Sequence, residues 1–336
     1  MRLPRFVFER AQVAVKEIFE YAHSPDWLRE LRQKLTDPRL IAVFDMPATD
    51  SSVLMSYDFH YDFSTEQLSL IEINTNASQY LLTAELDERA AKRALETLHK
   101  SFFDEWSKIN KTIIPPEWIA IVDENPTAQK TYFEFLMYKD LFRSWGVRDC
   151  SIYDINDLPV PELLIKNGFI YNRLTDFYLE SPSSAKLWAT WSQNQIALSP
   201  HPREYLLLAD KARLVDFSLK SVSNVLIPCR HIGSFKTADE IWAERKKLFF
   251  KPRSSFGAKA VYRGSSISQK MFQEILTKDY IVQEYRPPGE WMGKKFDLRF
   301  FVYKSDIQLV CARLYSGQVT NFSNPGGGIA LIEFSS

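Results

Sequence analysis

The middle of the chain alternates between short apolar segments and helical stretches, and this alternation limits the choice of fold more than any other feature. Ile119–Val122 predicts a strand, Thr127–Trp145 a helix and Cys150–Tyr153 a second strand. The same order returns from Phe169–Tyr171, through a further helix, to Ile196–Leu198. Strands that alternate with helices are typical of a parallel sheet covered by helices. We therefore expect an α/β layer in the middle of the chain.

The N-terminal third follows other patterns. The first 35 residues have apolar positions at helical spacing, and Leu40–Phe44 predicts a short strand. Val53–Phe63 and Leu68–Asn74 predict the two strands of a hairpin, and Ala84–Ile109 predicts a long amphipathic helix.

Strands dominate the last ninety residues, which indicates an antiparallel α+β region with one clear helix, Gln269–Leu276. The expected strands are Leu248–Lys251, Ala260–Tyr262, Tyr280–Tyr285, Phe296–Tyr303 and Ile307–Tyr315. Eight of the eleven glycines also lie at or after Gly257, and three are consecutive at Gly326–Gly328. Because glycine is kept where the backbone turns sharply or approaches a ligand, we look for a site in this region first.

Composition excludes several classes of partner. Lys plus Arg equals Asp plus Glu at 42 each, so nothing favours sequence-independent binding to nucleic acid. No run approaches 18 apolar residues, and the N-terminus lacks the pattern of an export signal, so neither a membrane span nor secretion is expected. Cys150, Cys229 and Cys311 are odd in number and far apart, unlike a disulfide framework or metal cluster. We expect a cytoplasmic protein.

The predicted hairpin carries acidic side chains that suit a metal. If Ser64–Glu66 is a three-residue turn, Asp58 lies across from Glu72, and Asn74 lies on the same face. In this register His60 would face Leu70 and Asp62 would face Leu68. Two carboxylates at this distance repel each other unless a cation lies between them, and their oxygens are the ligands that magnesium prefers. The alternative is that these residues line a solvated strand face.

Two lysines are placed where they could hold phosphates. Lys211 lies at or near the start of a helix, and Lys251 ends an apolar strand. After Lys251 come Ser254, Ser255 and Gly257, a small-residue loop whose backbone amides could surround a phosphate. The spacing is not that of a Walker loop. Either lysine alone would be interpreted as a surface lysine beside a strand.

A third group of polar residues lies on the predicted C-terminal hairpin. Arg299 follows Asp297 in one strand, and Arg313 lies in the returning strand, each among apolar neighbours. A buried-facing arginine needs an anion or a carboxylate partner. Asn321 and the glycine triplet follow, and they indicate either a backbone approach to a ligand or a tight turn.

Together these segments resemble the ATP-grasp superfamily of carboxylate ligases over roughly residues 50–334. In most members the acidic magnesium strand, with its E-x-N pattern, comes last, whereas here Ile71–Asn76 comes first. That circularly permuted order is the one found in eukaryotic glutathione synthetase, and the chain is similar to a bacterial group with the same order. The resemblance implies an ATP-grasp fold of α/β and α+β type, with a parallel α/β substrate-domain layer.

The resemblance also implies three domains and a set of site residues. Residues 1–115 would hold the N-terminal helices and the metal-binding hairpin, 116–200 the substrate domain, and 201–336 the nucleotide-binding region. The nucleotide would be bound by Lys211, Lys251, Ser254, Ser255, Gly257, Gln283, Glu284, Tyr285 and Asp297, with the backbone of the strand ending at Tyr285 pairing with adenine. The substrate would be bound by Arg173, Asp176, Asn76, Ser78 and Asn321. Catalysis would use Arg313 and Arg299, and the metal would be held by Asp58, Glu72 and Asn74.

Two departures from the glutathione enzyme matter. Ser254 and Ser255 stand where that enzyme has a glutamate that also binds magnesium, so the metal set would be smaller or rearranged. Met55–Tyr57 lacks its substrate arginine. Glutathione synthesis is therefore not carried over to this chain.

The function implied is an ATP- and Mg²⁺-dependent (alternatively Mn²⁺-dependent) carboxylate–amine ligase that forms an acyl phosphate and then an amide, releasing ADP and phosphate. Its partners would be small-molecule or peptide substrates, with no nucleic acid and no membrane. Two alternatives remain open: a phosphotransferase on the same fold, and an ATP-binding protein without catalysis. The sequence defines neither the acid, the amine nor the oligomeric state.

Overall fold

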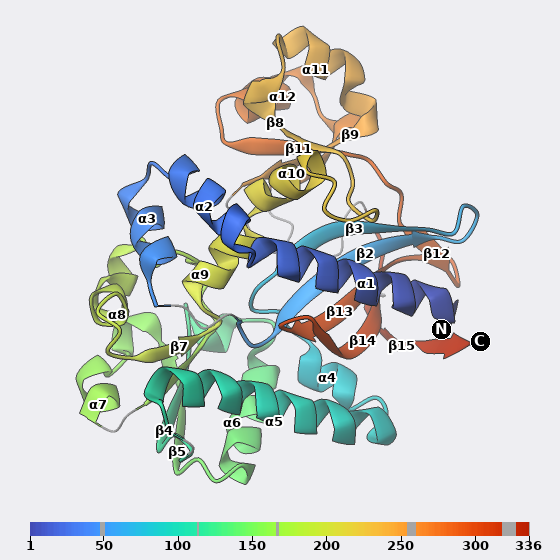
Figure 1. Cartoon of the computed structure of the whole chain (residues 1–336). Helices are drawn as coiled ribbons and strands as arrows, with labels where there is room; N and C mark the ends of the chain where they lie inside the picture. The colour runs from blue at the N-terminus through green and yellow to red at the C-terminus, as the bar shows by residue number, and fades with distance from the viewer. Residues whose placement is uncertain (48–50, 113, 166–167, 254–259, 318–326, 336) are drawn as a thin grey trace.

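The computed structural model describes residues 1–47, 51–112, 114–165, 168–253, 260–317 and 327–335. Its strands form a six-stranded sheet at the centre, two four-stranded sheets and a two-stranded pair at the chain ends. Figure 1 shows the central sheet between the parallel sheet with its helices below and a smaller lobe above. No helix in these parts of the chain has the length and apolar character needed to cross a lipid bilayer.

The central sheet joins strands from both ends of the chain. Its order is β15-β14-β13-β2-β3, with β12 paired to β13. The bounds are β2 Met55–Asp62, β3 Gln67–Asn74, β12 Gly289–Trp291, β13 Lys294–Tyr303, β14 Asp306–Tyr315 and β15 Gly328–Leu331. The hairpin β2–β3 pairs antiparallel with β13, so the predicted packing of this hairpin beside the C-terminal strands is confirmed. β1 (Arg2–Pro4) and β16 (Glu333–Ser335) form the parallel pair.

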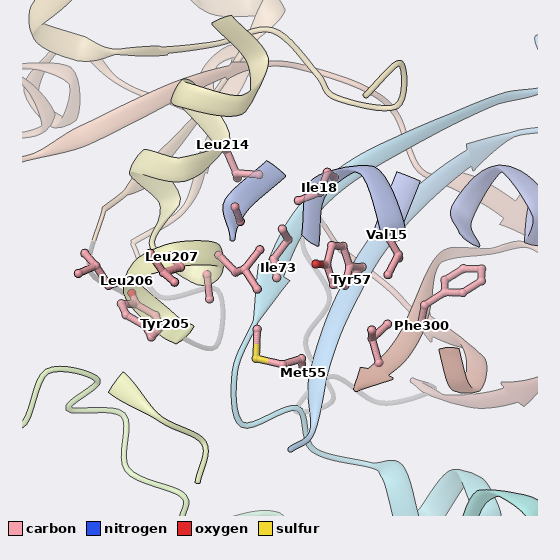
Figure 2. Close-up of a cluster of buried hydrophobic side chains, with 14 of the residues drawn as sticks. Val15, Ile18, Met55, Tyr57, Ile73, Tyr205, Leu206, Leu207, Leu214 and Phe300 are labelled. Carbon is pink, nitrogen blue, oxygen red and sulfur yellow. The ribbon is translucent and has the colours of Figure 1, made fainter. Parts of the chain in front are cut away.

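Side chains alternate along the strands of the central sheet, so one face is apolar under α1, and the opposite face carries the polar residues of the cleft together with Phe301, which packs toward the parallel sheet. Tyr57, Phe59 and Tyr61 of β2 are buried under α1 (Arg5–Ala22). Helix α1 contributes residues at helical spacing, among them Val15 and Ile18, which Figure 2 shows beside Tyr57. Asp58 and His60 therefore lie on the opposite face, toward the rest of the molecule.

The middle of the chain forms a fully parallel sheet in the order β5-β4-β6-β7, as the strand–helix alternation predicts. Its strands are β4 Trp118–Asp123, β5 Asp149–Asp154, β6 Phe169–Asn172 and β7 Ala197–Ser199. The helices of this region are α4 Tyr80–Ala84, α5 Glu88–Asn110, α6 Tyr132–Ser144, α7 Val160–Ile165 and α8 Ala185–Trp191. Phe102 and Trp106 of α5 share one core with the parallel sheet and with Phe301 of the central sheet, so the two sheets are packed as one body.

The small lobe has a core of its own. Its sheet runs β10-β9-β11-β8, with bounds β8 Cys229–His231, β9 Leu248–Pro252, β10 Tyr262–Arg263 and β11 Tyr280–Glu284. Helices α11 (Ala238–Glu244) and α12 (Gln269–Leu276) cover this sheet. Phe250 of β9 and Phe272 of α12 are buried in the core that the sheet and the helices share. The remaining helices are α2 Pro25–Lys34, α3 Pro38–Asp45, α9 Pro202–Glu204, a π-turn Tyr205–Ala209 and α10 Lys211–Leu219. Short 3-10 turns lie at Pro126–Ala128, Ile155–Asp157, Pro182–Ser184, Ile232–Ser234, Arg245–Lys247 and Gly264–Ser266.

One sequence expectation about local structure is wrong, and another needs a new start. The predicted strand Leu40–Phe44 is part of helix α3, because Pro38 opens the helix and the side chain of Asp37 caps it by accepting the backbone N–H of Arg39 at 2.7 Å. A short apolar run does not itself distinguish helix from strand. The long helix predicted over Ala84–Ile109 is confirmed as α5, although it begins four residues later, at Glu88.

The hairpin turn also differs from the expectation, yet the key pair is correct. Four residues separate β2 from β3, so His60 faces Ser69, and Asp62 faces Gln67. A β-bulge between Asp58 and Phe59 then shifts the register by one residue. As a result Asp58 does lie across from Glu72, as predicted.

Candidate active site

A cleft of about 810 Å³ opens between the central sheet, the small lobe and the carboxyl edge of the parallel sheet. Most of the residues selected from the sequence lie on its walls. These are Asp58, Glu72, Asn74, Asn76, Ser78, Arg173, Lys211, Lys251, Gln283, Glu284, Tyr285, Asp297, Arg299 and Arg313. The fold thus brings together segments that are more than 200 residues apart in the chain.

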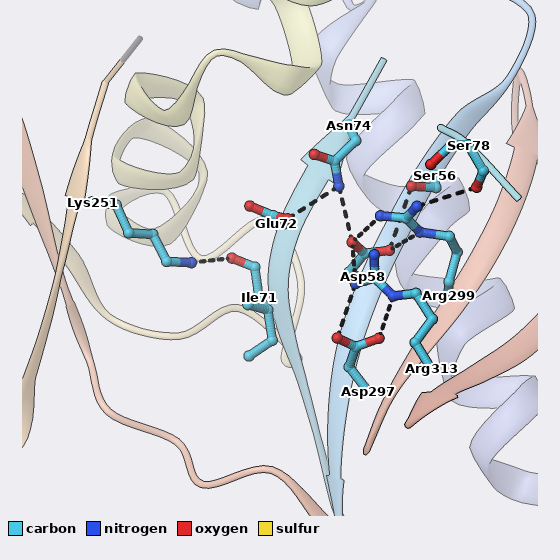
Figure 3. A network of polar contacts seen from close by, with 10 residues as sticks. All are labelled: Ser56, Asp58, Ile71, Glu72, Asn74, Ser78, Lys251, Asp297, Arg299 and Arg313. Carbon is cyan, nitrogen blue, oxygen red and sulfur yellow. Dashed lines mark hydrogen bonds and ion pairs between the residues drawn. The ribbon is translucent and has the colours of Figure 1, made fainter. Parts of the chain in front are cut away.

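Asp58 is the centre of a buried network of charges on the floor of the cleft (Figure 3). It is 1% exposed and accepts two hydrogen bonds from Arg299, from Nε at 2.9 Å and from Nη2 at 2.7 Å. Arg313 donates to it at 2.9 Å and also forms a bidentate pair with Asp297, at 2.6 and 2.9 Å. Neighbouring register positions on β2, β13 and β14 explain this proximity.

The guanidinium groups of Arg299 and Arg313 stabilise the ionised form of Asp58. Burial disfavours its ionised form, but Arg299 and Arg313 outweigh burial and hold its pKa below the ordinary value. Both carboxylate oxygens are engaged by N–H donors, including Nδ2 of Asn74 at 3.0 Å. The cations beside Asp58 are therefore Arg299 and Arg313, and Nδ2 of Asn74 lies between Asp58 and Glu72.

Glu72 and Asn74 keep the better oxygens for a metal. Nδ2 of Asn74 points to Asp58 and, at 3.4 Å, to Glu72, which directs the amide oxygen away from both. Magnesium is commonly bound by one or two protein oxygens together with substrate phosphates. This donor set fits a magnesium ion shared with a triphosphate. Among the residues described here, no group of three or more His, Cys, Asp or Glu side chains is arranged as a metal cluster.

Lys251 links the small lobe to strand β3 of the central sheet. Its Nζ donates to the carbonyl of Ile71 at 2.7 Å, directly beside Glu72 (Figure 3). The side chain is 2% exposed, and burial lowers the pKa of its ammonium, an effect that Glu72 opposes. Lys251 and Glu72 thus lie side by side on the wall of the cleft, and the binding of a phosphate by Lys251 stays a prediction.

Lys211 is placed by a second buried carboxylate. It is the first residue of α10, and Asp210 caps that helix by accepting the backbone N–H of Ala212 at 2.9 Å. Asp210 also accepts both Nε and Nη2 of Arg253 at 3.1 Å and the hydroxyl of Tyr178 at 2.7 Å. Arg253 directly follows β9, so this network joins the segments that carry Lys211 and Lys251.

Two backbone N–H groups of the segment expected to pair with adenine are already hydrogen-bonded within the protein. The backbone N–H of Glu284 donates to Pro228 at 3.0 Å, and that of Tyr285 donates to Lys247 at 2.8 Å. A base would therefore meet the carbonyl groups here, or the chain beyond Tyr285, rather than these two N–H groups. The sequence analysis missed the apolar walls beside this strand, Phe249 and Ile227. Phe249 was detectable as the apolar residue two positions before Lys251.

The parallel sheet contributes Arg173 and an acid that the sequence analysis missed. Asp123 ends β4, and Arg173 follows β6, so both lie at the carboxyl edge, where open α/β sheets bind ligands. Arg173 is 7% exposed, and its Nε has no hydrogen-bond partner among the described residues. Burial raises the pKa of Asp123 to about 6, which Arg173 moderates. The strand-end position of Asp123 was the signal that could have identified it.

Three of the remaining predicted residues have structural contacts. Asn76 donates to the carbonyl of Leu174 at 2.9 Å, and the carbonyl of Ser78 accepts Arg299 at 3.4 Å. The structure does not bring Asp176 to the cleft; its carboxylate accepts the backbone N–H groups of residues 180 and 181 at 2.8 and 2.9 Å. The other predicted residues, Ser254, Ser255, Gly257, Asn321 and Gly326, lie outside the described part of the chain.

Comparison with solved structures shows the fold. A glutathione synthetase-like effector from Globodera pallida in its apo form has a TM-score of 0.55 at 11% identity, over 99% of this chain and 88% of that chain. A putative gamma-glutamylcysteine synthetase from Methylobacillus flagellatus KT has a TM-score of 0.51 at 9% identity, over 96% of this chain and 85% of that one. No protein-family model and no curated protein matches the sequence. The chain thus has an ATP-grasp-like, glutathione synthetase-like fold.

Proposed function

We propose that the protein is an ATP- and Mg²⁺-dependent carboxylate–amine ligase that acts through an acyl phosphate. The observation that supports this most is the single cleft with two chemically different ends. One end offers Lys211, Lys251 and Glu72, which suit a triphosphate and its metal. The other end offers Arg173 and Asp123, which suit a carboxylate and an amine. A nucleotide-binding protein without catalysis would not require the second end.

At the phosphate end, the two lysines bind and orient the triphosphate, and Glu72 with Asn74 would hold the magnesium. When bound, magnesium would neutralise charge on the terminal phosphates. The substrate carboxylate attacks the γ-phosphorus, the bond to ADP breaks, and an acyl phosphate forms. Arg313 lines the same cleft as these residues, but it is already paired with Asp58 and Asp297. Its role is therefore mainly to fix the floor of the cleft.

At the substrate end, the amine attacks the acyl carbon, and inorganic phosphate leaves with the electrons of the broken C–O bond. The attacking nitrogen must lose a proton in this step. Asp123 lies in the cleft with a pKa of about 6, so it is ionised at neutral pH and available to accept that proton. The free Nε of Arg173 is available to orient a substrate carboxylate.

The reaction is tested by trapping the intermediate. Purified protein is incubated with ATP, Mg²⁺, hydroxylamine and a pool of small carboxylates, amino acids and short peptides. We expect Mg²⁺-dependent ADP together with hydroxamate, and loss of both in Lys211→Ala and Glu72→Gln. The matched control is Lys236→Ala, an exposed lysine of the small lobe, which should behave as the unmodified protein.

The products separate the alternatives. AMP with pyrophosphate would indicate adenylation and contradict the mechanism. ADP with a phosphorylated alcohol and no hydroxamate would support a phosphotransferase instead. Absence of ATP binding in calorimetry would remove the enzyme proposal altogether.

A further inference from the structure

One polar side chain of the cleft, His60, has no role in the reaction described above. It lies on β2 and lines the cleft together with Asp58. The register pairs Arg299 with Asp58 and Leu298 with Phe59, which places His60 one step further, beside Asp297. His60 therefore belongs to the polar face of the central sheet, in the row next to the one that contains Asp58 and Glu72.

The groups on either side of His60 indicate which part of a bound nucleotide would lie over its ring. On one side is the phosphate end, marked by the contact of Lys251 with Ile71 and by Glu72. On the other side is the chain that follows the predicted adenine-binding strand, because Nδ1 of His60 lies 2.9 Å from the carbonyl oxygen of Arg286. In a nucleoside triphosphate the group between the base and the phosphates is the ribose. His60 is thus positioned beside the sugar of a bound nucleotide.

The hydrogen bond to Arg286 also determines what His60 can recognise. A carbonyl oxygen only accepts, so Nδ1 carries the proton, and Nε2 of the neutral ring is an acceptor. The bond at Nδ1 is the one side-chain hydrogen bond that His60 makes to the described residues, so Nε2 remains open to a ligand. An acceptor suits a hydroxyl group, which can donate, and does not suit a phosphate oxygen, which cannot. The charged side chains that act on the pKa of the ring are Asp297, which raises it, and Lys251 and Arg313, which lower it together with burial.

We propose that His60 is a specificity residue that accepts a hydrogen bond from a ribose hydroxyl of the bound nucleotide and so selects ribonucleotides over deoxyribonucleotides. This inference rests on the nucleotide binding in the proposed function, but not on the ligase reaction. The hydroxyl at the 2′ or the 3′ position would supply the same chemistry, and the experiment distinguishes them.

The test is a cycle of protein and ligand changes, measured as dissociation constants by calorimetry in the presence of Mg²⁺. The ligands are ATP, 2′-deoxy-ATP and 3′-deoxy-ATP. We expect the unmodified protein to bind one of the deoxynucleotides about three- to tenfold more weakly than ATP, the range for one neutral hydrogen bond. The hydroxyl whose loss weakens binding is the one that His60 reads.

Two variants separate the nitrogens of the ring. His60→Asn can keep a donor near the position of Nδ1 but has no acceptor at Nε2, so it should bind ATP and both deoxynucleotides equally. His60→Gln places an amide near the position of Nε2 and should keep part of the preference. A merely structural role would weaken all three ligands by the same factor and leave the preference unchanged.

Each outcome decides the proposal. Equal binding of the three nucleotides by the unmodified protein would overturn it, without any need for a folded variant. A preference that persists in His60→Asn would assign the hydroxyl to another residue and also overturn it. Absence of ATP binding would end both this inference and the proposed function. A His60-dependent ribose preference without hydroxamate formation would support this inference while the ligase proposal fails.

Discussion

Replacing Asp58 by Asn should cost the protein several kcal/mol of stability, because this one carboxylate holds two arginines in the floor of the cleft. The substitution keeps the shape of the side chain and removes its charge. Arg299 would then lose its bidentate partner, and Arg313 would keep only Asp297. All four side chains are less than 10% exposed, so water cannot readily replace the lost contacts.

The magnitude follows from the geometry. Three N–H bonds from guanidinium groups end on Asp58, at 2.7 to 2.9 Å, and a hydrogen bond to a charged group contributes about 1.5–3 kcal/mol. These contributions are not additive, since an amide oxygen still accepts some of the donors. Removing one partner of a buried ion pair costs about 3–5 kcal/mol. We expect a loss within this range.

Urea denaturation followed by tryptophan fluorescence measures the loss. The first control is Asp62→Asn, a carboxylate on the same strand that contacts only the turn at Ser64 and should change stability by less than about 0.5 kcal/mol. The second control is Asp297→Asn, after which Arg313 still contacts Asp58. This control should cost less than Asp58→Asn.

The pH dependence gives an independent check. The pKa of Asp58 is lowered in the folded state, so its contribution is present above the unfolded value of about 4 and is lost as pH falls through the folded pKa. The stability difference between the unmodified protein and Asp58→Asn should therefore narrow in acid, below about pH 4. A loss under about 1 kcal/mol at neutral pH, or a difference that widens in acid, would refute the reasoning.

Two further predictions concern other buried carboxyl groups. Burial raises the pKa of Glu105 from 4.5 to about 7, so stability should fall by about 3 kcal/mol as pH rises across that interval, and Glu105→Gln should flatten the profile of unfolding free energy against pH. A profile with the same slope in the variant would contradict the assignment. Arg253→Ala should weaken ATP binding by about 1–3 kcal/mol, because Lys211 would be misplaced, whereas Arg230→Ala in the same lobe should not weaken it. Calorimetry measures the ATP affinity of both variants. Equal affinities for the two variants would show that the Asp210 network does not position Lys211 for ATP.

The sequence predicted the parts of the fold in which local pattern and tertiary packing agree. The strand–helix alternation determined the parallel sheet, and the E-I-N pattern of Ile71–Asn74 identified the hairpin that joins the central sheet. The strand predicted at Leu40–Phe44 failed because capping by Asp37 and the proline after it outweighed the apolar run. The predicted turn length was also wrong. The β-bulge after Asp58 nevertheless restored the predicted pairing of Asp58 with Glu72, and no residue pattern predicts this bulge.

The partner of Asp58 could not have been predicted from the same information. A carboxylate that faces another carboxylate requires a cation, and the sequence offers magnesium, lysine and arginine for this role without distance information. Only the pairing of β2 with β13, and of β13 with β14, places Arg299 and Arg313 on Asp58. That pairing joins residues more than 200 positions apart. The need of the hairpin carboxylates for a cation could be predicted from the sequence, but the arginines that meet Asp58 could be identified only from the tertiary structure.

Strand β3 joins the N-terminal hairpin to two sides of the cleft. The side chains of Glu72 and Asn74 face the cleft, and the carbonyl between them and the hairpin turn, that of Ile71, receives Lys251 from the small lobe. One strand thus carries Glu72 and Asn74, the proposed metal ligands, and fixes Lys251, the lysine proposed to bind the same phosphates. This arrangement depends on the neighbours of β3 in space and not on its position in the sequence. The N-terminal hairpin therefore completes a cleft whose other walls come from the parallel sheet, the small lobe and the C-terminal strands.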